Sequence, residues 1–391
     1  MILGNVPSQR LAFPRDLDLW RDWHEGAHPL RAAKTRAVSA LRPGGSAGVP
    51  GPAGLRLTWR GTQPRILLAV DATTPTQIAS VLRPLAHLGG EDVAILSTAE
   101  VQSVLPDIGG GTGPWEQREL PSGERRPEEL DALRVVAATG HYLPAGALAH
   151  RWVEDTGAAF VVVQHGLLTP YAPPLPHGSC LLAFSEPDAE FYSWHRPDVT
   201  TRVIGSQLLW GASRPERRAP DSASLERPVF LGQLHGAELP RRDTARAAQE
   251  FCGATGAVYR PHPGEKDKLS RAQHAVWRAR GMSVDTGGSS LAALDAPVAS
   301  VFSTGVLEAA ARGLPARVTH PDPPRWVEAF WERYGMVRWN GSASGAGAQS
   351  TSAPTTPPPA VPAEEPARAA ARSLREHCGA SLHQRTEGTT P

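Results

Sequence analysis

Short apolar segments alternate with amphipathic segments along most of the chain, from about residue 61 to about residue 340. The apolar segments have the length of buried parallel strands, and the amphipathic ones have the spacing of helices that cover a sheet. In the first half, strands are predicted at 66–70, 93–96, 135–138, 160–163, 181–184 and 199–204. In the second half, they are predicted at 229–231, 257–259, 283–285, 298–302 and 316–318. Helices are predicted between them, for example over 75–88 and 145–154.

This alternation predicts an α/β protein with two Rossmann-like, doubly wound parallel-sheet domains that face each other across a cleft. The chain has 391 residues, enough for two domains with a core in each. An N-terminal acceptor domain is predicted at 61–205, and a C-terminal nucleotide-donor domain at 206–340.

Both ends of the chain differ in composition from the middle. Residues 1–60 are predicted to be an N-terminal extension, with helical spacing over 17–41 that is broken near Pro29, followed by a Gly/Pro linker. Docking of this helix on the main body is favoured, and peripheral contact with a membrane or a protein is the alternative. Residues 341–391 are of low complexity and are predicted to be largely disordered, with a short helix over 367–377.

Composition excludes several classes of protein. Lys and Arg number 40 and Asp and Glu 39, so a net charge of +1 provides no overall attraction to nucleic acid. No apolar run approaches the roughly 20 residues that span a bilayer, and no secretory signal pattern is visible. Cys180, Cys252 and Cys378 are too far apart for a metal knuckle or a disulfide framework. A reduced, cytoplasmic protein that does not bind nucleic acid is therefore expected.

Polar clusters follow several of the predicted strands. In open α/β sheets, ligands bind beyond the carboxyl ends of the strands, so these clusters are the candidate site. The clusters are Asp71, Gln164-His165-Gly166, Arg260-Pro261-His262 and Ser303-Thr304-Gly305.

The Ser303-Thr304-Gly305 cluster opens a predicted helix. The N–H groups and partial positive charge of a helix start can hold a phosphate, although Ser and Thr are also ordinary N-caps. Glu308 lies one turn further and could bind ribose hydroxyls or support the first turn.

The two histidine clusters and Asp71 each allow a functional and a structural role. His262 lies between two prolines and could donate to a phosphate beside the Arg260 guanidinium, or it could be a half-buried loop residue. His165 could be a base or a phosphate-binding group, or it could satisfy nearby carbonyls. Asp71 could be a general base or a helix cap.

Motifs of other enzyme classes are absent from the sequence. It contains no GxxxxGK[ST], HExxH or GxSxG pattern, and its 14 histidines are not at metal-ligand spacing. No metal and no cofactor are therefore predicted.

Several motifs, taken in order, resemble those of GT-B glycosyltransferases. They are the QHG loop at 164–166, RVIGSQLLWGA at 202–212, FLGQL at 230–234, YRPHPGEKD at 259–267 and FSTGVLEAAARGLP at 302–315. The resemblance covers about residues 65–318. It is strongest to the bacterial capsule and teichoic-acid group, which includes polysialyltransferases and CDP-glycerol glycerophosphotransferases.

The resemblance implies roles for particular residues. His262-Pro263 and Ser303-Thr304 would bind the phosphates of a CMP- or CDP-linked donor, and His165-Gly166 would lie on the acceptor side, with no metal needed. The acidic pair followed by Gly that serves polysialyltransferases as base has no match, since 154–157 reads EDTG. The catalytic base therefore stays open between His165 and Asp71.

These observations predict a metal-independent transferase. It would move a sugar or polyol-phosphate group from a CMP-, CDP- or UDP-linked donor to a hydroxyl of a glycan or polyol acceptor. One alternative is an enzyme similar to nucleotide-sugar 2-epimerases, although 300–302 reads SVF where those enzymes carry an acid. The other alternative is a non-catalytic GT-B-like protein that binds a nucleotide or a partner.

Overall fold

Two compact units make up the fold of the chain. The computed structural model describes residues 10–27, 54–109, 114–121, 125–214, 216, 227–285, 291, 294–341 and 354–387. Unit 1 comprises Leu167–Tyr171 and Leu209–Val361, and unit 2 comprises Arg10–Gly166, Ala172–Leu208 and Pro362–Pro391. The main division thus falls between Leu208 and Leu209, where the sequence predicted it between 205 and 206.

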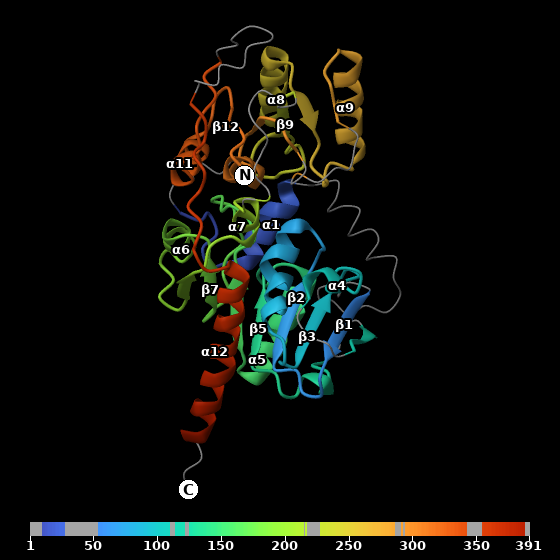
Figure 1. The fold of residues 1–391 in the computed structure, drawn as a ribbon, viewed down its shortest axis with the longest axis vertical. Coiled ribbons are helices and arrows are strands. Elements are labelled where there is room, and N and C mark those ends of the chain that lie inside the picture. Colours follow the sequence, from blue (N-terminus) through green and yellow to red (C-terminus); the bar gives the residue numbers. More distant parts are fainter. Residues whose placement is uncertain are drawn as a thin grey trace. The chain divides into compact units, whose positions relative to one another are not determined.

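Unit 2 is built on an eight-stranded sheet of order β4-β1-β3-β2-β5-β6-β7-β8 (Figure 1). Its strands are β1 (Leu55–Arg60), β2 (Ile66–Val70), β3 (Val93–Ser97), β4 (Glu116–Leu120), β5 (Val135–Ala138), β6 (Ala159–Val163), β7 (Cys180–Ala183) and β8 (Thr200–Val203). All neighbouring strands are parallel except β1, which runs antiparallel to both β3 and β4.

Both faces of the central strands in unit 2 are covered. Every residue of β2 is buried, and alternate residues point to opposite faces, so the strand has to be apolar throughout. Ile66, Leu68 and Val70 pack in one cluster with residues of η1, η2 and α12, while α5 also contacts β2, β3, β5 and β6. The helical segments of unit 2 are α1 (Leu17–Ala27), α3 (Pro75–Gln77), η1 (Ile78–Leu82), η2 (Arg83–His87), α4 (Leu105–Ile108), η3 (Glu128–Leu130), α5 (Pro144–Thr156), α6 (Glu186–Tyr192) and α12 (Pro366–Glu387).

Unit 1 contains a smaller, fully parallel sheet of order β10-β9-β11-β12. Its strands are β9 (Val229–Leu231), β10 (Val258–Arg260), β11 (Val298–Ser300) and β12 (Ala316–Val318), and its helices are α8 (Arg241–Thr255), α9 (Lys268–Ala279), α10 (Thr304–Ala311) and α11 (Arg325–Arg333). Helix α7 (Gln207–Ala212) carries the chain from one unit into the other. The strand predicted at 283–285 is reduced to a single bridge between Val284 and Tyr259.

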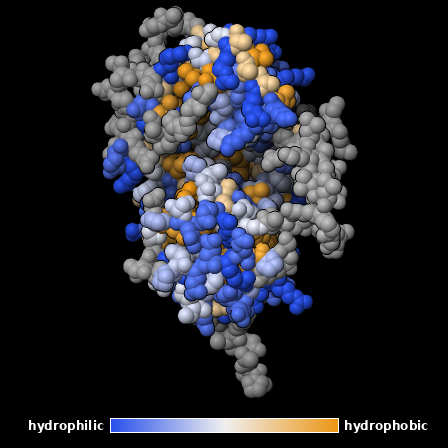
Figure 2. All heavy atoms as spheres, turned by 90° about the vertical axis from the view of Figure 1, so that its right-hand side faces the viewer, coloured by the Kyte–Doolittle hydropathy of each residue, from blue (hydrophilic) through white to orange (hydrophobic). Residues whose placement is uncertain are grey.

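The two-sheet α/β architecture predicted from the sequence is therefore confirmed, and two antiparallel strands of unit 2 were missed. Strand β1 lies within the predicted extension, and β4 has the sequence EQREL, which carries no run of apolar residues. As the edge strand, β4 needs no apolar face, and charged side chains protect it from pairing with other chains. Figure 2 looks toward the β1–β4 side of unit 2 and shows mainly hydrophilic side chains there.

The helix predicted over 75–88 is present as three different turns. Residues Pro75–Gln77 are α-helical, Ile78–Leu82 form a π-helix, and Arg83–His87 form a 3₁₀-helix. Pro84 stands at the start of the last segment, where its missing N–H and its ring oppose continued α-helix. The apolar spacing thus predicted a helical segment correctly, and Pro84 explains why its last turn is a 3₁₀-helix.

The predicted N-terminal helix is present over Leu17–Ala27, and its predicted continuation to residue 41 lies outside the described residues. Trp20 is only 8% exposed, and its ring lies 5.3 Å from that of Tyr142. Helix α1 thus docks on unit 2, as favoured from the sequence. Within the described ranges, no helix has the length and apolar character needed to cross a membrane.

The C-terminal segment is more ordered than the sequence suggested. Residues 342–353 and 388–391 are outside the described part, whereas residues 354–387 are described and contain helix α12. Thr355 and Thr356 hydrogen bond to the backbone of Ala316 beside β12. Helix α12 is longer than the predicted 367–377 and packs one face onto unit 2, with Ala369, Ala370, Ala371, Leu374 and Cys378 in its core. The small alanine side chains allow this helix to pack closely on the sheet. Amino-acid composition alone does not predict such a contact.

We expect Leu374→Ala to lower the free energy of unfolding of unit 2 by about 2–5 kcal/mol, because it leaves a cavity under α12. Leu374 is 1% exposed within this core. Urea unfolding of the full chain followed by circular dichroism measures the change. Arg368→Ala, at an exposed position of the same helix, is the matched control. Equal stability of the two variants would show that α12 contributes no packing energy.

Candidate functional site

The first cluster of candidate residues lies where β9, β10 and β11 of unit 1 end. These strands are neighbours and parallel, so their following loops lie along one edge of the sheet. The side chain of Gln233, after β9, accepts hydrogen bonds from the Ser300 hydroxyl (3.0 Å) and from the N–H of Phe302 (3.0 Å). The loops after β9 and β11 are thereby tied together.

The carboxylate of Glu265 ties the loops after β9 and β10. It accepts hydrogen bonds from the N–H of Leu234 (3.0 Å), the N–H of His262 (3.2 Å) and the Tyr259 hydroxyl (2.9 Å). The Nε2 atom of His274 lies 2.9 Å from the Oε2 atom of Glu265. Glu265 is only 5% exposed, so this carboxylate is a buried anchor. The sequence alone does not predict this role, because GEKD resembles an exposed charged loop. The available signal is an acidic residue three positions after His262.

His262 is exposed and stacks on a second histidine that the sequence analysis did not select. The rings of His262 and His235 are parallel to within 10°, with centroids 3.9 Å apart. The N–H of Gly264 donates to Nδ1 of His262 over 3.0 Å. Partial removal of water from the ring lowers the pKa of His262, and the nearby Glu265 carboxylate opposes this with a smaller effect.

The Ser303-Thr304-Gly305 cluster opens helix α10, as predicted. The Ser303 hydroxyl accepts a hydrogen bond from the N–H of Gly305 (3.2 Å), so this side chain is an N-cap. Gly305 is needed for packing, because a Cβ there would lie 2.5 Å from Leu231 and 2.8 Å from Leu291. Ser303 therefore has the N-cap role that the sequence offered as the alternative to phosphate binding. The helix start still presents its partial positive charge beside Thr304.

Arg260 and Glu308, also predicted for this site, lie in partly or fully buried surroundings. Arg260 ends β10, and its Nε is 4.0 Å from the carboxylate of Asp285. Glu308 is 8% exposed and lines a small, mostly apolar cavity together with Arg312. Glu308 thus lies on the buried side of α10, which gives no support for its predicted contact with ribose.

The second cluster lies in unit 2, in the QHG loop after β6. Gln164 is 2% exposed; it accepts a hydrogen bond from the N–H of Phe184 (2.8 Å) and donates to the carbonyl of Gly166 (2.9 Å). It also donates to the buried Asp188 carboxylate over 3.2 Å. The loop is thus fixed from behind by Gln164, with His165 next in the chain.

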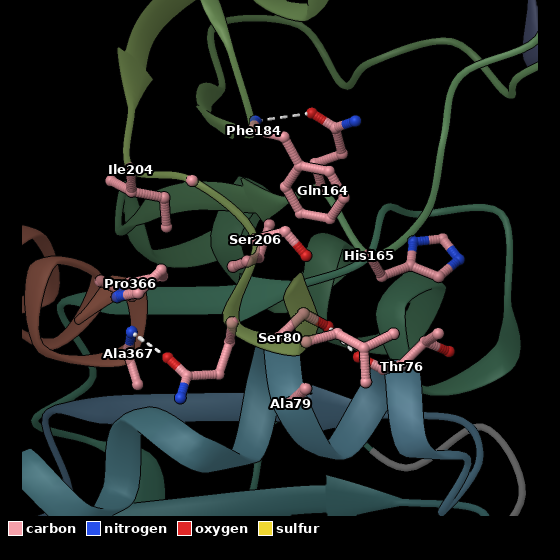
Figure 3. A pocket seen from close by; sticks show the side chains of 15 residues that line it. Thr76, Ala79, Ser80, Gln164, His165, Phe184, Ile204, Ser206, Pro366 and Ala367 are labelled. Atoms are coloured by element: carbon pink, nitrogen blue, oxygen red, sulfur yellow. Dashed lines mark hydrogen bonds between the residues drawn. The ribbon is translucent and has the colours of Figure 1, made fainter. Parts of the chain in front are cut away.

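His165 lines a pocket that is open to solvent (Figure 3). The His165 ring and Thr76 lie on one side of this pocket, and Pro366 and Ala367 of α12 lie on the other. Among the described residues, the pocket lining contains no Asp, Glu, Lys or Arg; it comprises Thr76, Ala79, Ser80, Val163, Gln164, His165, Phe184, Ile204, Gly205, Ser206, Gln207, Leu208, Pro366, Ala367 and Ala370. Burial lowers the pKa of His165 to about 4, so its ring is neutral at pH 7.

Asp71, the other candidate base, follows β2. Its carboxylate accepts hydrogen bonds from the N–H groups of Ala145 (2.7 Å) and Gly146 (3.5 Å), at the start of α5. Burial raises the pKa of Asp71, and these hydrogen bonds oppose the shift. Asp71 thus stabilises a helix start, the structural alternative already considered, although the helix is α5 and not the one that follows Asp71 directly.

Comparison with known proteins assigns no family. No family model matches the chain, and none of the curated proteins matches it. Among solved structures, a mutant of the O-GlcNAc transferase of Thermobaculum terrenum is similar over 82% of this chain and 64% of that chain. The TM-score is 0.38 and the sequence identity 12%. This similarity is too low to carry an assignment, so the chain's own two parallel sheets and strand-end clusters remain the basis for its function.

We expect Glu265→Ala to lower the free energy of unfolding of unit 1 by about 3 kcal/mol or more, because it leaves several buried donors unsatisfied. Denaturant unfolding of the full chain measures this change. Glu250→Ala is the control, since Glu250 is half-exposed on α8 and pairs with exposed Arg246; its effect should stay within about 0.5 kcal/mol. A small loss in both variants would contradict the anchoring role of Glu265.

Proposed function

We propose that this chain is a transferase of the GT-B type. It moves a sugar or polyol-phosphate group from a CMP-, CDP- or UDP-linked donor to a hydroxyl of a glycan or polyol acceptor. The observation that carries the proposal is the convergence of the ends of β9, β10 and β11 on His262 and the start of α10, held by Gln233 and Glu265. A strand-end site with backbone N–H groups and a fixed imidazole suits a phosphate group.

Unit 1 would hold the donor in this proposal. Because Nδ1 of His262 accepts from Gly264, its Nε2 carries the proton and can donate to a phosphate oxygen. The start of α10, beside Thr304, adds a partial positive charge at the same sheet edge. These groups stabilise the negative charge that the nucleotide phosphate gains as it leaves.

Unit 2 would hold the acceptor in the pocket that His165 lines. The neutral lining favours uncharged groups, which fits the hydroxyls of a glycan or polyol. Neutral His165 accepts the proton of the acceptor hydroxyl while the oxygen of this hydroxyl bonds to the transferred group. The bond between that group and the nucleotide phosphate breaks, and the phosphate retains the electron pair. Asp71 is the weaker candidate because its carboxylate already accepts two backbone N–H groups.

We expect His262→Ala to weaken nucleotide binding about tenfold or more, because one hydrogen bond to a charged phosphate is lost. Thermal-shift and calorimetric titrations of the full chain with CMP, CDP and UDP measure the effect. His177→Ala, at an exposed position in unit 2, is the control and should bind normally. If none of the three nucleotides binds the unchanged chain, the donor site is refuted.

We expect His165→Ala to reduce release of nucleotide from the bound donor by about 10²–10⁴-fold, the usual loss when a general base is removed. Donor binding should stay unchanged, because His165 belongs to unit 2 and the donor residues to unit 1. Chromatography of the nucleotide released, with and without added acceptor glycans, measures the rate. Binding without any release in the unchanged chain would support the non-catalytic alternative.

A further inference from the structure

His235 has no role in the donor site as proposed, yet its ring stacks on that of His262, which is exposed. It belongs to the loop after β9, which the motif FLGQL precedes, and it is half-buried. Its ring lies parallel to that of His262, at 3.9 Å between centroids. Two imidazoles at this distance cannot both carry a proton without strong repulsion.

The hydrogen bond from the N–H of Gly264 determines which nitrogen of His262 bears its proton. Nδ1 accepts this bond over 3.0 Å, so the neutral ring carries its hydrogen on Nε2. Protonating Nδ1 would place two hydrogens against each other and break the bond. The loop geometry therefore favours one neutral tautomer of His262.

Both loops that carry the rings are fixed to one buried group. Glu265 accepts the N–H of Leu234, next to His235, and the N–H of His262 itself. The two rings also lie close to Gly264, since a Cβ at this position would lie 3.1 Å from His235 Cδ2 and 3.1 Å from His262 Nδ1. The stack is thus part of the loop packing and does not depend on two freely rotating surface side chains.

We infer that His235 is a positioning residue that holds His262 as a neutral imidazole, so that the donor site offers one N–H, from Nε2, to a diphosphate oxygen. This inference rests on the proposed function for its ligand, a nucleoside diphosphate ester. The neutral state of the His262 ring is inferred from its stacking on His235, the hydrogen bond from Gly264 and the hydrogen bond from the His262 backbone N–H to Glu265.

The neutral state has a measurable consequence for binding. An imidazolium attracts a diphosphate through its charge, so a site that uses one binds more tightly as the pH falls. A neutral N–H donor binds with the same strength across neutral pH. Among the described residues, the ionisable side chains in contact with His262 are His235 and Glu265, and the buried Glu265 carboxylate is committed to its own hydrogen bonds.

The test compares His235→Ala with His235→Phe in the full chain. Phenylalanine keeps a flat ring against His262 and removes only the nitrogens, whereas alanine exposes the His262 ring to water. Histidine ring signals in nuclear magnetic resonance give the tautomer and the pKa of His262. We expect the Nε2–H tautomer and a pKa below about 6.5 in the unchanged chain and in His235→Phe, with a return toward about 6.5 in His235→Ala.

The second measurement is the affinity for CDP-glycerol and UDP-N-acetylglucosamine, whose diphosphates keep one charge state between about pH 6 and about pH 8. We expect affinity to change less than about twofold over this range in the unchanged chain and in His235→Phe. In His235→Ala, binding should become about fivefold tighter at the lower pH, because His262 can then gain a proton. Circular dichroism confirms that each variant remains folded.

Two results would overturn the inference: a His262 titration that His235→Ala leaves unchanged, or affinity in the unchanged chain that rises steeply as the pH falls. Loss of binding in both variants would mean that a nitrogen of His235 touches the donor itself, which also refutes a purely positioning role. If neither donor binds the unchanged chain, the proposed function fails. The ring titration alone then decides whether His235 holds His262 neutral.

Discussion

Buried amide and carboxylate side chains satisfy the backbone N–H groups that the parallel strands leave at their carboxyl ends, and both candidate sites depend on this. A buried N–H without an acceptor is costly, and strand ends beside a site expose several of them. Gln77 accepts the N–H groups of Asp71 and Ala72 after β2. Gln164, Gln233 and Glu265 do the same for later loops. Because these side chains hold the loops from behind, His165 and His262 are placed by groups that need not touch a ligand.

A common electrostatic arrangement follows in the two units. Charged groups near the strand ends turn toward the protein backbone: Asp71 toward the start of α5, and Glu265 toward the loops of unit 1. Burial lowers the pKa of His165 to about 4, and partial removal of water from the ring also lowers the pKa of His262. Recognition in such sites relies on hydrogen-bond direction and helix dipoles more than on full charges.

The sequence predicted those parts of the fold in which burial dictates residue type. Strand β2 is apolar at every position because both of its faces are covered, and its bounds were predicted correctly. Strand β4 carries no such signal, because an edge strand can be polar. His262 was found through its prolines, but Glu265 and His235 were not, since their roles arise from contacts between loops. The packing of α12 was not predicted, because alanines are common in both exposed and buried helices and therefore do not indicate which face is buried.

The position of α12 in the chain has a consequence for biosynthesis. Unit 2 is made from segments that precede and follow most of unit 1, so its sheet is complete long before α12 leaves the ribosome. At about 5–20 residues per second, the intervening segment takes roughly 8 to 30 seconds to translate. During this time the apolar residues of η1 and η2 that α12 later covers face water. Nascent chains of this protein therefore offer a binding surface to cellular chaperones that the finished protein lacks.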